Sequence, residues 1–187
     1  MTAISTISAA TEPAPAAPFA TDTAIPADLH PDITDPLLRD LIRPEHTDWS
    51  PRELRDLTMT VAAELTTPLL HVLRYTQPRR WWSRLGLTAG VELWLLSWLP
   101  GQQTKPHDHG GAIGSFTVLR GRLAEEYRYP GGPVRSQRYT VGDAIGFGAG
   151  RAHQLGNHDP AVPAASVHAY SPPLVPTREY QSLLDVT

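Results

Sequence analysis

Two histidines separated by one residue are the first candidates for chemistry in this chain. His107 and His109 lie within the stretch 106–111. On an extended segment, residues at positions i and i+2 project from the same face, so their imidazoles would lie side by side. Such a pair can hold a metal ion from two directions, and a metal site needs at least one further ligand.

The composition limits the ligands and the functions that are open to the chain. The 187 residues include no cysteine, so a metal must be held by histidine and carboxylate groups and no disulfide forms. The net charge of -3 provides no basic surface for nucleic acid, and no apolar run is long enough to cross a membrane. We therefore expect a soluble protein that acts on small molecules, as a monomer by default.

The N-terminal residues 1–27 are rich in Ala, Pro and Thr and contain no basic residue. This composition builds no core and predicts a disordered tail, to which we assign no function. A secretory signal would need a basic segment followed by a continuous apolar one, so we expect a cytoplasmic protein. The rest of the chain, 28–187, is long enough for one domain.

Two helices are expected before the His pair. Apolar residues recur at helical spacing over 32–43. A second helix begins at Ser50, because Pro51 follows at the first helical position and Glu53 completes a capping box. Its apolar face consists of Leu54, Leu57, Val61 and Leu65. Such a face most often packs on its own domain.

After residue 73 the sequence consists of short segments rich in Trp, Tyr, Val and Leu, separated by Gly and Pro. The expected strands are 81–87, 91–99, 112–120, 122–129, 135–139, 144–147 and 165–170. This spacing is typical of an antiparallel barrel or sandwich. We predict a mainly β fold, a small β-barrel with an N-terminal helical layer, with the His pair in the barrel mouth.

A third histidine, His153, completes two motifs that resemble those of the cupin superfamily. The first motif, with glycines around His-x-His, maps onto Gly101, His107, His109 and Gly121. The second motif maps onto Gly142, Gly150, His153 and Asn157, with Gly148 in place of its proline. The resemblance implies a cupin (jelly-roll) fold and a metal site formed by His107, His109 and His153.

The glutamate of the first cupin motif is missing here, because its position falls on Gly114. The expected site therefore consists of three neutral imidazoles. Around Fe(II), such a set leaves the full metal charge and open positions for a thiolate and dioxygen. Zn(II) also accepts three histidines, so the triad alone does not choose between oxidation and hydrolysis. A Zn or Mn isomerase or hydrolase remains an alternative.

Ser166, His168 and Tyr170 form a second constellation. At positions i, i+2 and i+4 of a strand they share one face, where their polar groups could form a hydrogen-bonded file. A strand of an antiparallel sheet can also carry such residues simply as a polar outer face. The pattern alone leaves both interpretations open.

The continuous stretch 166–173, Ser-x-His-x-Tyr-Ser-Pro-Pro, resembles the signature of cysteine dioxygenases, and the likeness extends over about 81–174. It implies an Fe(II)-dependent oxidoreductase of cysteine catabolism. In this chemistry L-cysteine binds iron through its thiolate and amine, and both atoms of O2 are transferred to sulfur to give cysteine sulfinic acid. It also implies that Tyr170 is the acid/base or hydrogen-bonding group at the substrate, tuned by His168, which Ser166 orients.

Some members of that family carry a thioether between a cysteine and this tyrosine. The corresponding position here is Gly114 and the chain has no cysteine, so this cofactor cannot form. The family also binds the substrate carboxylate with an arginine. Arg84, in a Trp-Ser-Arg sequence, is the best counterpart, while Arg80 has the same strand parity and Arg79 is also near.

Other substrates remain open at this point. A relative acting on 3-mercaptopropionate or another small thiol acid would share the three histidines and the Ser-His-Tyr file. A cupin that only senses a small molecule normally comes with a DNA-binding segment. No helix-turn-helix with a basic face precedes the predicted barrel.

Overall fold

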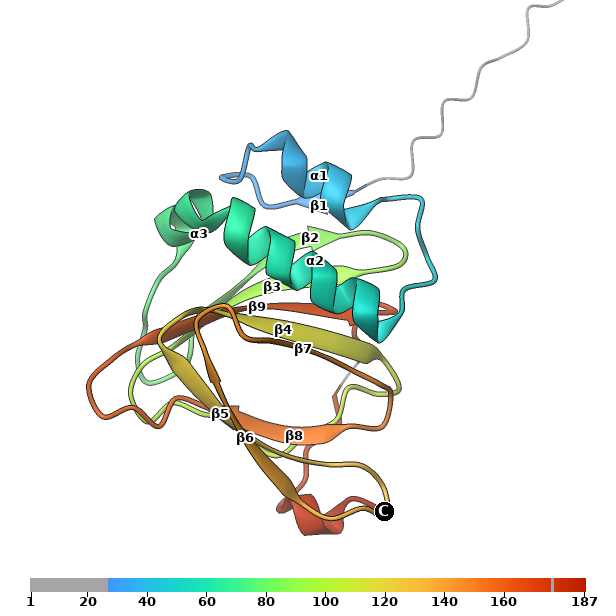
Figure 1. Cartoon of the computed structure of the whole chain (residues 1–187), viewed down its shortest axis with the longest axis vertical. Helices are drawn as coiled ribbons and strands as arrows, with labels where there is room; N and C mark the ends of the chain where they lie inside the picture. The colour runs from blue at the N-terminus through green and yellow to red at the C-terminus, as the bar shows by residue number, and fades with distance from the viewer. Residues whose placement is uncertain (1–26, 176) are drawn as a thin grey trace, which may run out of the picture.

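The computed structural model describes residues 27–175 and 177–187 (Figure 1). The predicted disordered tail therefore lies outside the described residues, except for Ala27. The elements are β1 (Asp28–Leu29), α1 (Pro36–Ile42), α2 (Pro51–Glu64), α3 (Thr66–Val72), β2 (Trp82–Leu87), β3 (Glu92–Trp98), β4 (Ile113–Arg120), β5 (Arg122–Arg128), β6 (Arg135–Thr140), β7 (Ala144–Phe147), β8 (Ala152–Gly156), β9 (Ala164–Ser171) and the 3-10 helix η1 (Leu183–Asp185).

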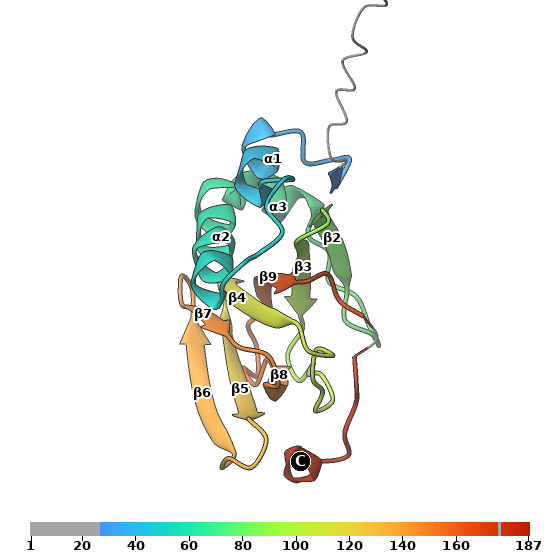
Figure 2. The ribbon, with the colours of Figure 1, turned by 90° about the vertical axis from the view of Figure 1, so that its right-hand side faces the viewer.

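The strands form two antiparallel sheets. The larger sheet has the order β1-β2-β3-β9-β4-β7, and the smaller has the order β6-β5-β8. Figure 1 and Figure 2 show the helices covering one face of the larger sheet, while the smaller sheet lies on the other side. The predicted mainly β architecture with an N-terminal helical layer is confirmed.

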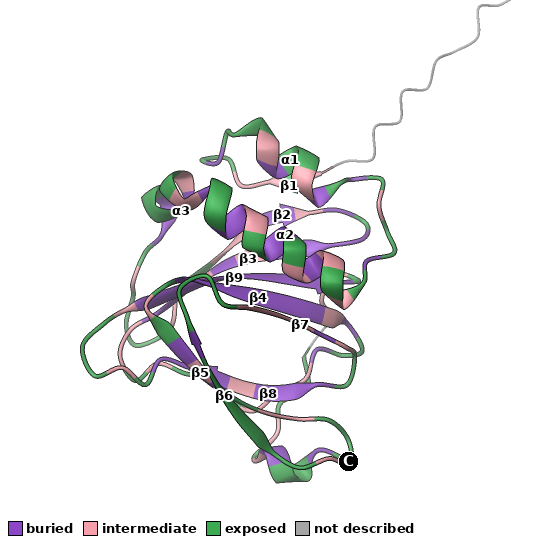
Figure 3. Cartoon of the chain, viewed as in Figure 1, coloured by how far each residue is buried: buried purple, intermediate pink, exposed green. Residues whose placement is uncertain are grey.

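Strand β9 lies at the centre of the larger sheet, between β3 and β4, and is buried along its whole length (Figure 3). Its pairing runs from Glu92↔Tyr170 to Trp98↔Ala164 on one side and from Ile113↔Ser171 onward on the other. Because strand side chains alternate between faces, β9 takes part in two different interiors. Ala165, Val167 and Ala169 pack in the core under the helices, whereas Tyr170 belongs to the core between the sheets.

The helical layer follows the local signals of the sequence. Ser50 and Glu53 form the predicted capping box, and the apolar face of α2 is buried against the sheet. Helix α1 begins at Pro36, later than the predicted residue 32, because the Asp35 side chain accepts a hydrogen bond from the Leu37 N–H and caps the helix there. The short helix α3, which follows α2 directly, was not predicted. No helix in the described ranges is long and apolar enough to span a bilayer.

Candidate metal and substrate site

A backbone exchange brings two of the predicted ligands together. The chain before β4 runs antiparallel to β8, so that the His107 N–H donates to the His153 carbonyl at 3.0 Å and the His153 N–H donates back at 2.8 Å. Residues paired in this way project from the same face. His109 follows two residues later, and candidate ligand atoms of the three histidines lie within 4.8 Å of one another. The three predicted metal ligands are therefore neighbours in space.

The nitrogen atoms of these histidines suit a metal ion. His107 Nδ1 lies 2.8 Å from the Lys105 carbonyl and His153 Nδ1 lies 2.6 Å from Glu125 Oε1, so each ring keeps Nε2 free. Both ring nitrogens of His109 are buried and have no hydrogen-bond partner among the described residues. An unpartnered buried imidazole nitrogen is costly, and a metal ion would satisfy one of the two nitrogens of this ring.

Burial keeps these imidazoles in the form that binds metal. It lowers the pKa of His107 to about 4, with a smaller effect from the neighbouring His153. It also lowers the pKa of His109 far below its usual value, again with help from the other two rings. Two of the three ligands are thus neutral at physiological pH, as metal coordination requires.

The position where the cupin glutamate is missing, Gly114, is tightly packed. A Cβ atom added at Gly114 would collide with the Phe147 ring and would lie 3.0 Å from Tyr170 Cδ1. Phe147 therefore fills the space that a side chain at this position would need. Neither a carboxylate nor a cross-linking cysteine fits there without moving an aromatic ring.

The predicted file on β9 is a chain of hydrogen bonds. Ser166 Oγ lies 2.8 Å from His168 Nε2, and His168 Nδ1 lies 3.2 Å from the Tyr170 hydroxyl. All three residues are buried on the inner side of the sheet, so the outer-face alternative does not apply. The file has a fourth member, because the Trp98 indole N–H donates to Ser166 Oγ at 2.9 Å.

Trp98 fixes one end of this file. An indole only donates, so Ser166 Oγ accepts from Trp98, and the Ser166 hydroxyl can then donate to His168 Nε2. Burial lowers the pKa of His168 well below its usual value, so the ring is neutral. When Ser166 donates to Nε2, the hydrogen of this ring is on Nδ1 and points to the Tyr170 oxygen. Burial also raises the pKa of Tyr170, which keeps its proton. That proton remains available to a group in the cavity.

A cavity of about 460 Å³ opens at the histidines. Its lining combines His107, His109 and Tyr170 with an apolar wall of tryptophan and leucine side chains. The lining residues are Arg80, Trp82, Trp94, Leu96, Thr104, Lys105, His107, His109, Tyr170, Leu174, Thr177 and Glu179. Its size and mixed lining are those of a small-molecule site.

The structure separates the candidate arginines. Arg80 lines the cavity, its guanidinium stacks over Trp98 at 4.1 Å, and its buried Nη1 has no partner among the described residues. Burial lowers the pKa of Arg80 to about 10, so it remains charged. Arg84 lies outside the lining, with Nη2 at 2.9 Å from Asp28 Oδ2 and Nη1 at 3.6 Å from Glu92 Oε1. Arg79 is exposed.

Some residues around the site were not anticipated. Glu125 is buried against His153. Its alternation with Leu123 and Tyr127 along one strand could have indicated that it points inward. The C-terminal segment 177–180 has no such signal. It runs along the His107 loop, where Lys105 Nζ lies 2.7 Å from Glu179 Oε2.

Comparisons with known proteins agree with this fold. A family model described as cysteine dioxygenase type I matches residues 38–182. An uncharacterized conserved protein with a double-stranded beta-helix domain, from Klebsiella pneumoniae, is similar in structure with a TM-score of 0.50 and 21% identity, over 61% of this chain and 95% of that one. This likeness shows the cupin-like double-stranded β-helix.

Two further solved structures are similar to a lesser degree. The TT1209 protein from Thermus thermophilus has a TM-score of 0.48 and 23% identity, over 56% of this chain and 93% of that one. An oxalate oxidase in complex with glycolate has a TM-score of 0.49 and 19% identity, over 56% of each chain. No curated protein matches the chain.

Proposed function

Because the chain belongs to the cysteine dioxygenase type I family, we propose that it is an Fe(II)-dependent thiol dioxygenase whose substrate is L-cysteine. The reaction adds both atoms of O2 to the thiol and yields cysteine sulfinic acid. One observation carries the proposal. Two members of the three-histidine group, His107 and His109, line the same cavity as Tyr170 and Arg80.

His107, His109 and His153 would hold the metal, since they are the one set of imidazoles among the described residues with ligand atoms this close together. Bound Fe(II) would supply the redox chemistry and the open coordination positions that let a thiolate react with dioxygen. The chain's own residues would bind the thiol substrate, orient it and hold one proton at the Tyr170 hydroxyl.

Arg80 is proposed to bind the substrate carboxylate. A guanidinium pairs with a carboxylate through two parallel hydrogen bonds, and the buried Nη1 of Arg80 still lacks a partner among the described residues. Trp94 Nε1 is a second buried donor that has no hydrogen-bond partner among the described residues. The Trp94 side chain also lines the cavity. Arg84 is already paired with carboxylates, so we assign it to structure rather than to substrate.

Tyr170 is proposed to donate a hydrogen bond to the reacting group. With His168 Nδ1 donating to the Tyr170 oxygen, the file Trp98–Ser166–His168–Tyr170 leaves the phenol proton free, and Tyr170 stacks on His109 with ring centroids 4.8 Å apart. The hydroxyl is thus held beside a proposed metal ligand. Ser166 and His168 act through Tyr170 and not on the substrate directly.

Oxygen uptake tests this proposal. The full chain, loaded anaerobically with Fe(II), should consume O2 with L-cysteine and form one sulfinate for each O2 consumed. A zinc-loaded sample is the control, because zinc has no redox chemistry and should consume none. If the iron-loaded protein leaves cysteine and other small thiols unchanged, the dioxygenase proposal is wrong.

One observation favours 3-mercaptopropionate as a second candidate. Glu179, the one acidic residue among the described residues that line the cavity, is already paired with Lys105. The described lining residues include no unpaired carboxylate, so the amine of cysteine could be held only by the metal, whereas 3-mercaptopropionate has no amine and needs no such contact. Comparing kcat/KM for cysteine, 3-mercaptopropionate and other thiol acids in the same assay ranks these substrates. A Zn or Mn isomerase or hydrolase would instead show no oxygen uptake with any thiol.

A further inference from the structure

A buried carboxylate stands directly behind one of the proposed metal ligands. Glu125 is on β5, its side chain is fully buried, and Oε1 lies 2.6 Å from His153 Nδ1. Three further hydrogen bonds converge on this carboxylate. Arg151 donates from Nε at 3.2 Å and from Nη2 at 2.6 Å, and the Tyr139 hydroxyl donates at 2.9 Å.

The register of the small sheet makes this contact possible. Tyr127 pairs with His153 and Glu125 pairs with Leu155 across β5 and β8. Residues two apart on a strand share a face, so Glu125 is a diagonal neighbour of His153 on the inner face of the sheet. A shift of one residue would turn Glu125 away from the histidine.

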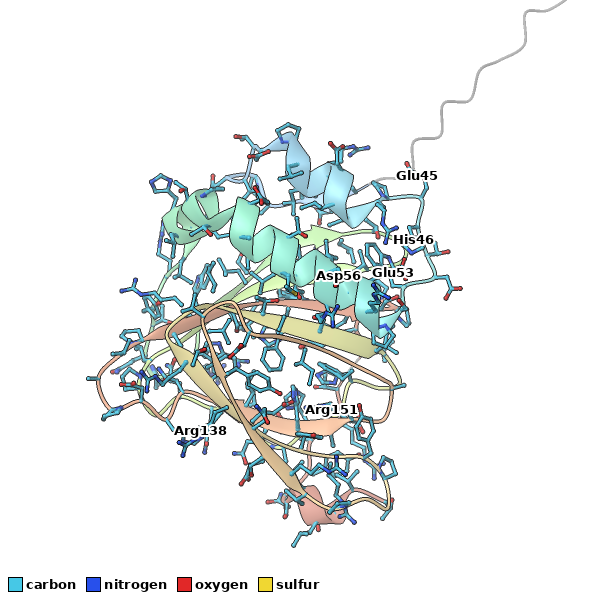
Figure 4. The ribbon with its side chains drawn as sticks, viewed as in Figure 1. Glu45, His46, Glu53, Asp56, Arg138 and Arg151 are labelled. Carbon is cyan, nitrogen blue, oxygen red and sulfur yellow. The ribbon has the colours of Figure 1, made fainter. Side chains whose placement is uncertain are left out.

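Arg151 compensates the buried charge. Its side chain is only 4% exposed, and its guanidinium lies 3.4 Å from the ring centroid of Tyr127. Figure 4 shows Arg151 beside β8, the strand that begins at the next residue. A buried carboxylate without such a partner would cost several kcal/mol. Arg151 and Tyr139 thus hold Glu125 in one orientation, with Oε1 towards His153.

The carboxylate determines which nitrogen of His153 is free. Because Glu125 accepts the hydrogen on Nδ1, Nε2 is the nitrogen left to offer a lone pair to a metal ion. Hydrogen bonding of a ligand histidine to a carboxylate fixes its ring and makes it a stronger base towards metal. No carboxylate is present at position 114 to bind the metal directly. Glu125 provides a carboxylate that would act on the metal through the His153 ring.

We propose that Glu125 is a positioning residue of the metal centre, which fixes His153 with Nε2 towards the ion and so raises the affinity for metal. The inference rests on the proposed three-histidine metal site. It assigns to Glu125, Arg151 and Tyr139 a role beyond the packing of the small sheet. If that role were packing alone, weakening the network would lower stability without changing the affinity of the folded protein.

Metal titration of the full chain separates these two roles. We would compare the wild type with Glu125→Gln, which keeps the shape of the side chain but removes its charge, by competition of Zn²⁺ or Co²⁺ against a chelator. The affinity should fall by about 10- to 100-fold, and the visible spectrum of the Co²⁺ form should change. Glu126→Gln is the matched control, because Glu126 is the next residue on β5 and is exposed. It should leave both measurements unchanged.

Two results would overturn the inference. One is a folded Glu125→Gln variant that binds metal as tightly as the wild type, even if its melting temperature is lower. A wild type that binds no metal would overturn both the inference and the proposed metal site, whereas equal affinities would leave that site intact.

If the variant does not fold, NMR of the ¹⁵N-histidine-labelled wild type gives the answer. His153 should be protonated on Nδ1 in the metal-free protein, with a proton resonance shifted downfield by its hydrogen bond. A hydrogen on Nε2 instead would overturn the inference.

Discussion

The two faces of β9 show how one strand serves both stability and chemistry. On one face Ala165, Val167 and Ala169 pack against the helices in a mainly apolar core, whose buried polar residues Thr58, Ser115 and Thr117 hydrogen-bond to one another. On the other face Ser166, His168 and Tyr170 are equally buried but connected by hydrogen bonds. Both sets are closed to solvent, and only the second faces the proposed metal ligands.

The comparison separates two uses of burial. Under the helices, burial removes apolar area from water and stabilises the fold. Between the sheets, burial shifts protonation, because it lowers the pKa of His168 and raises that of Tyr170 so that both stay neutral. We therefore expect substitutions on the inner side of the sheet to change activity, and substitutions on the helix side to change stability.

The largest effect is expected for His109→Ala. This change removes a proposed ligand and truncates a buried ring that stacks on Tyr170, so metal binding should be lost and the free energy of unfolding should also fall. Activity should fall by about 10³-fold or more, because no other group supplies the metal's chemistry. Metal content and oxygen uptake measure the two effects. A variant that keeps its iron and its rate would remove the inner face from the mechanism.

Tyr170→Phe should have the next largest effect. It deletes the terminal hydroxyl of the file but leaves the ring that stacks on His109. We expect the metal content to stay normal and kcat to fall by about 10²-fold, the low end of what a positioned proton donor contributes. Single-turnover measurements with metal analysis distinguish this result from metal loss. A similar loss of metal in Tyr170→Phe and His109→Ala would contradict the separate roles.

The two arginines provide a matched pair, because Arg80 lines the cavity and Arg84 lies outside its lining. Arg80→Ala should raise KM for the thiol acid by about 10- to 100-fold, because it removes a charged hydrogen-bond donor from the site. Arg84→Ala breaks ion pairs at a half-exposed side chain and should change KM little. Steady-state kinetics with both variants decide between them. The opposite order would place the carboxylate at Arg84.

Patterns within one strand or one loop could be predicted from the sequence, and contacts between distant segments could not. The spacing of Ser166, His168 and Tyr170 predicts a shared face because strand side chains alternate with period two. Spacing says nothing about whether that face is inside, which depends on the smaller sheet that covers it. The proximity of His153 to His107 was predicted only through a family resemblance. Backbone hydrogen bonds between two segments far apart in the sequence produce this contact.

The choice between Arg80 and Arg84 could not be made for a similar reason. Their equal parity assumed that both lie on one strand, but β2 begins at Trp82, so Arg80 lies before it. The direction of the Arg80 side chain is set by its stacking on Trp98, a contact across the fold. The neighbouring segment 177–180 reaches the site by tertiary contacts alone.

On the helix side of β9, Val167→Ala tests the expectation that substitutions there change stability and not activity. Val167 is fully buried in the core under the helices, and its truncation should lower the free energy of unfolding by about 1–2 kcal/mol. Urea denaturation measures this loss. The kcat and KM of the folded variant should remain within about 2-fold of the wild type, a difference of under about 0.5 kcal/mol. A large drop in kcat at unchanged metal content would mean that the two faces are coupled.

The smallest effect is expected at the start of α2, far from the cavity. Hydrogen bonds from the Ser50 backbone and hydroxyl lower the pKa of Glu53 to about 2, and Glu53 lies beside His46 (Figure 4). Because the folded pKa lies below the usual value of 4.5, the ionised side chain stabilises the protein above pH 4.5, and this stabilisation is lost as the pH falls towards 2.

Glu53→Gln should therefore lower the free energy of unfolding by about 0.5–1 kcal/mol at pH 7, a small value because the side chain is partly exposed. The difference from the wild type should shrink below pH 4.5 and disappear near pH 2. Urea denaturation across this range measures it, and Asp56→Asn, on the exposed side of the same helix, is the control. Oxygen uptake should be unchanged in both variants, since the helix side acts only through stability. A rate that followed the titration of Glu53 would show that the helical layer reaches the site.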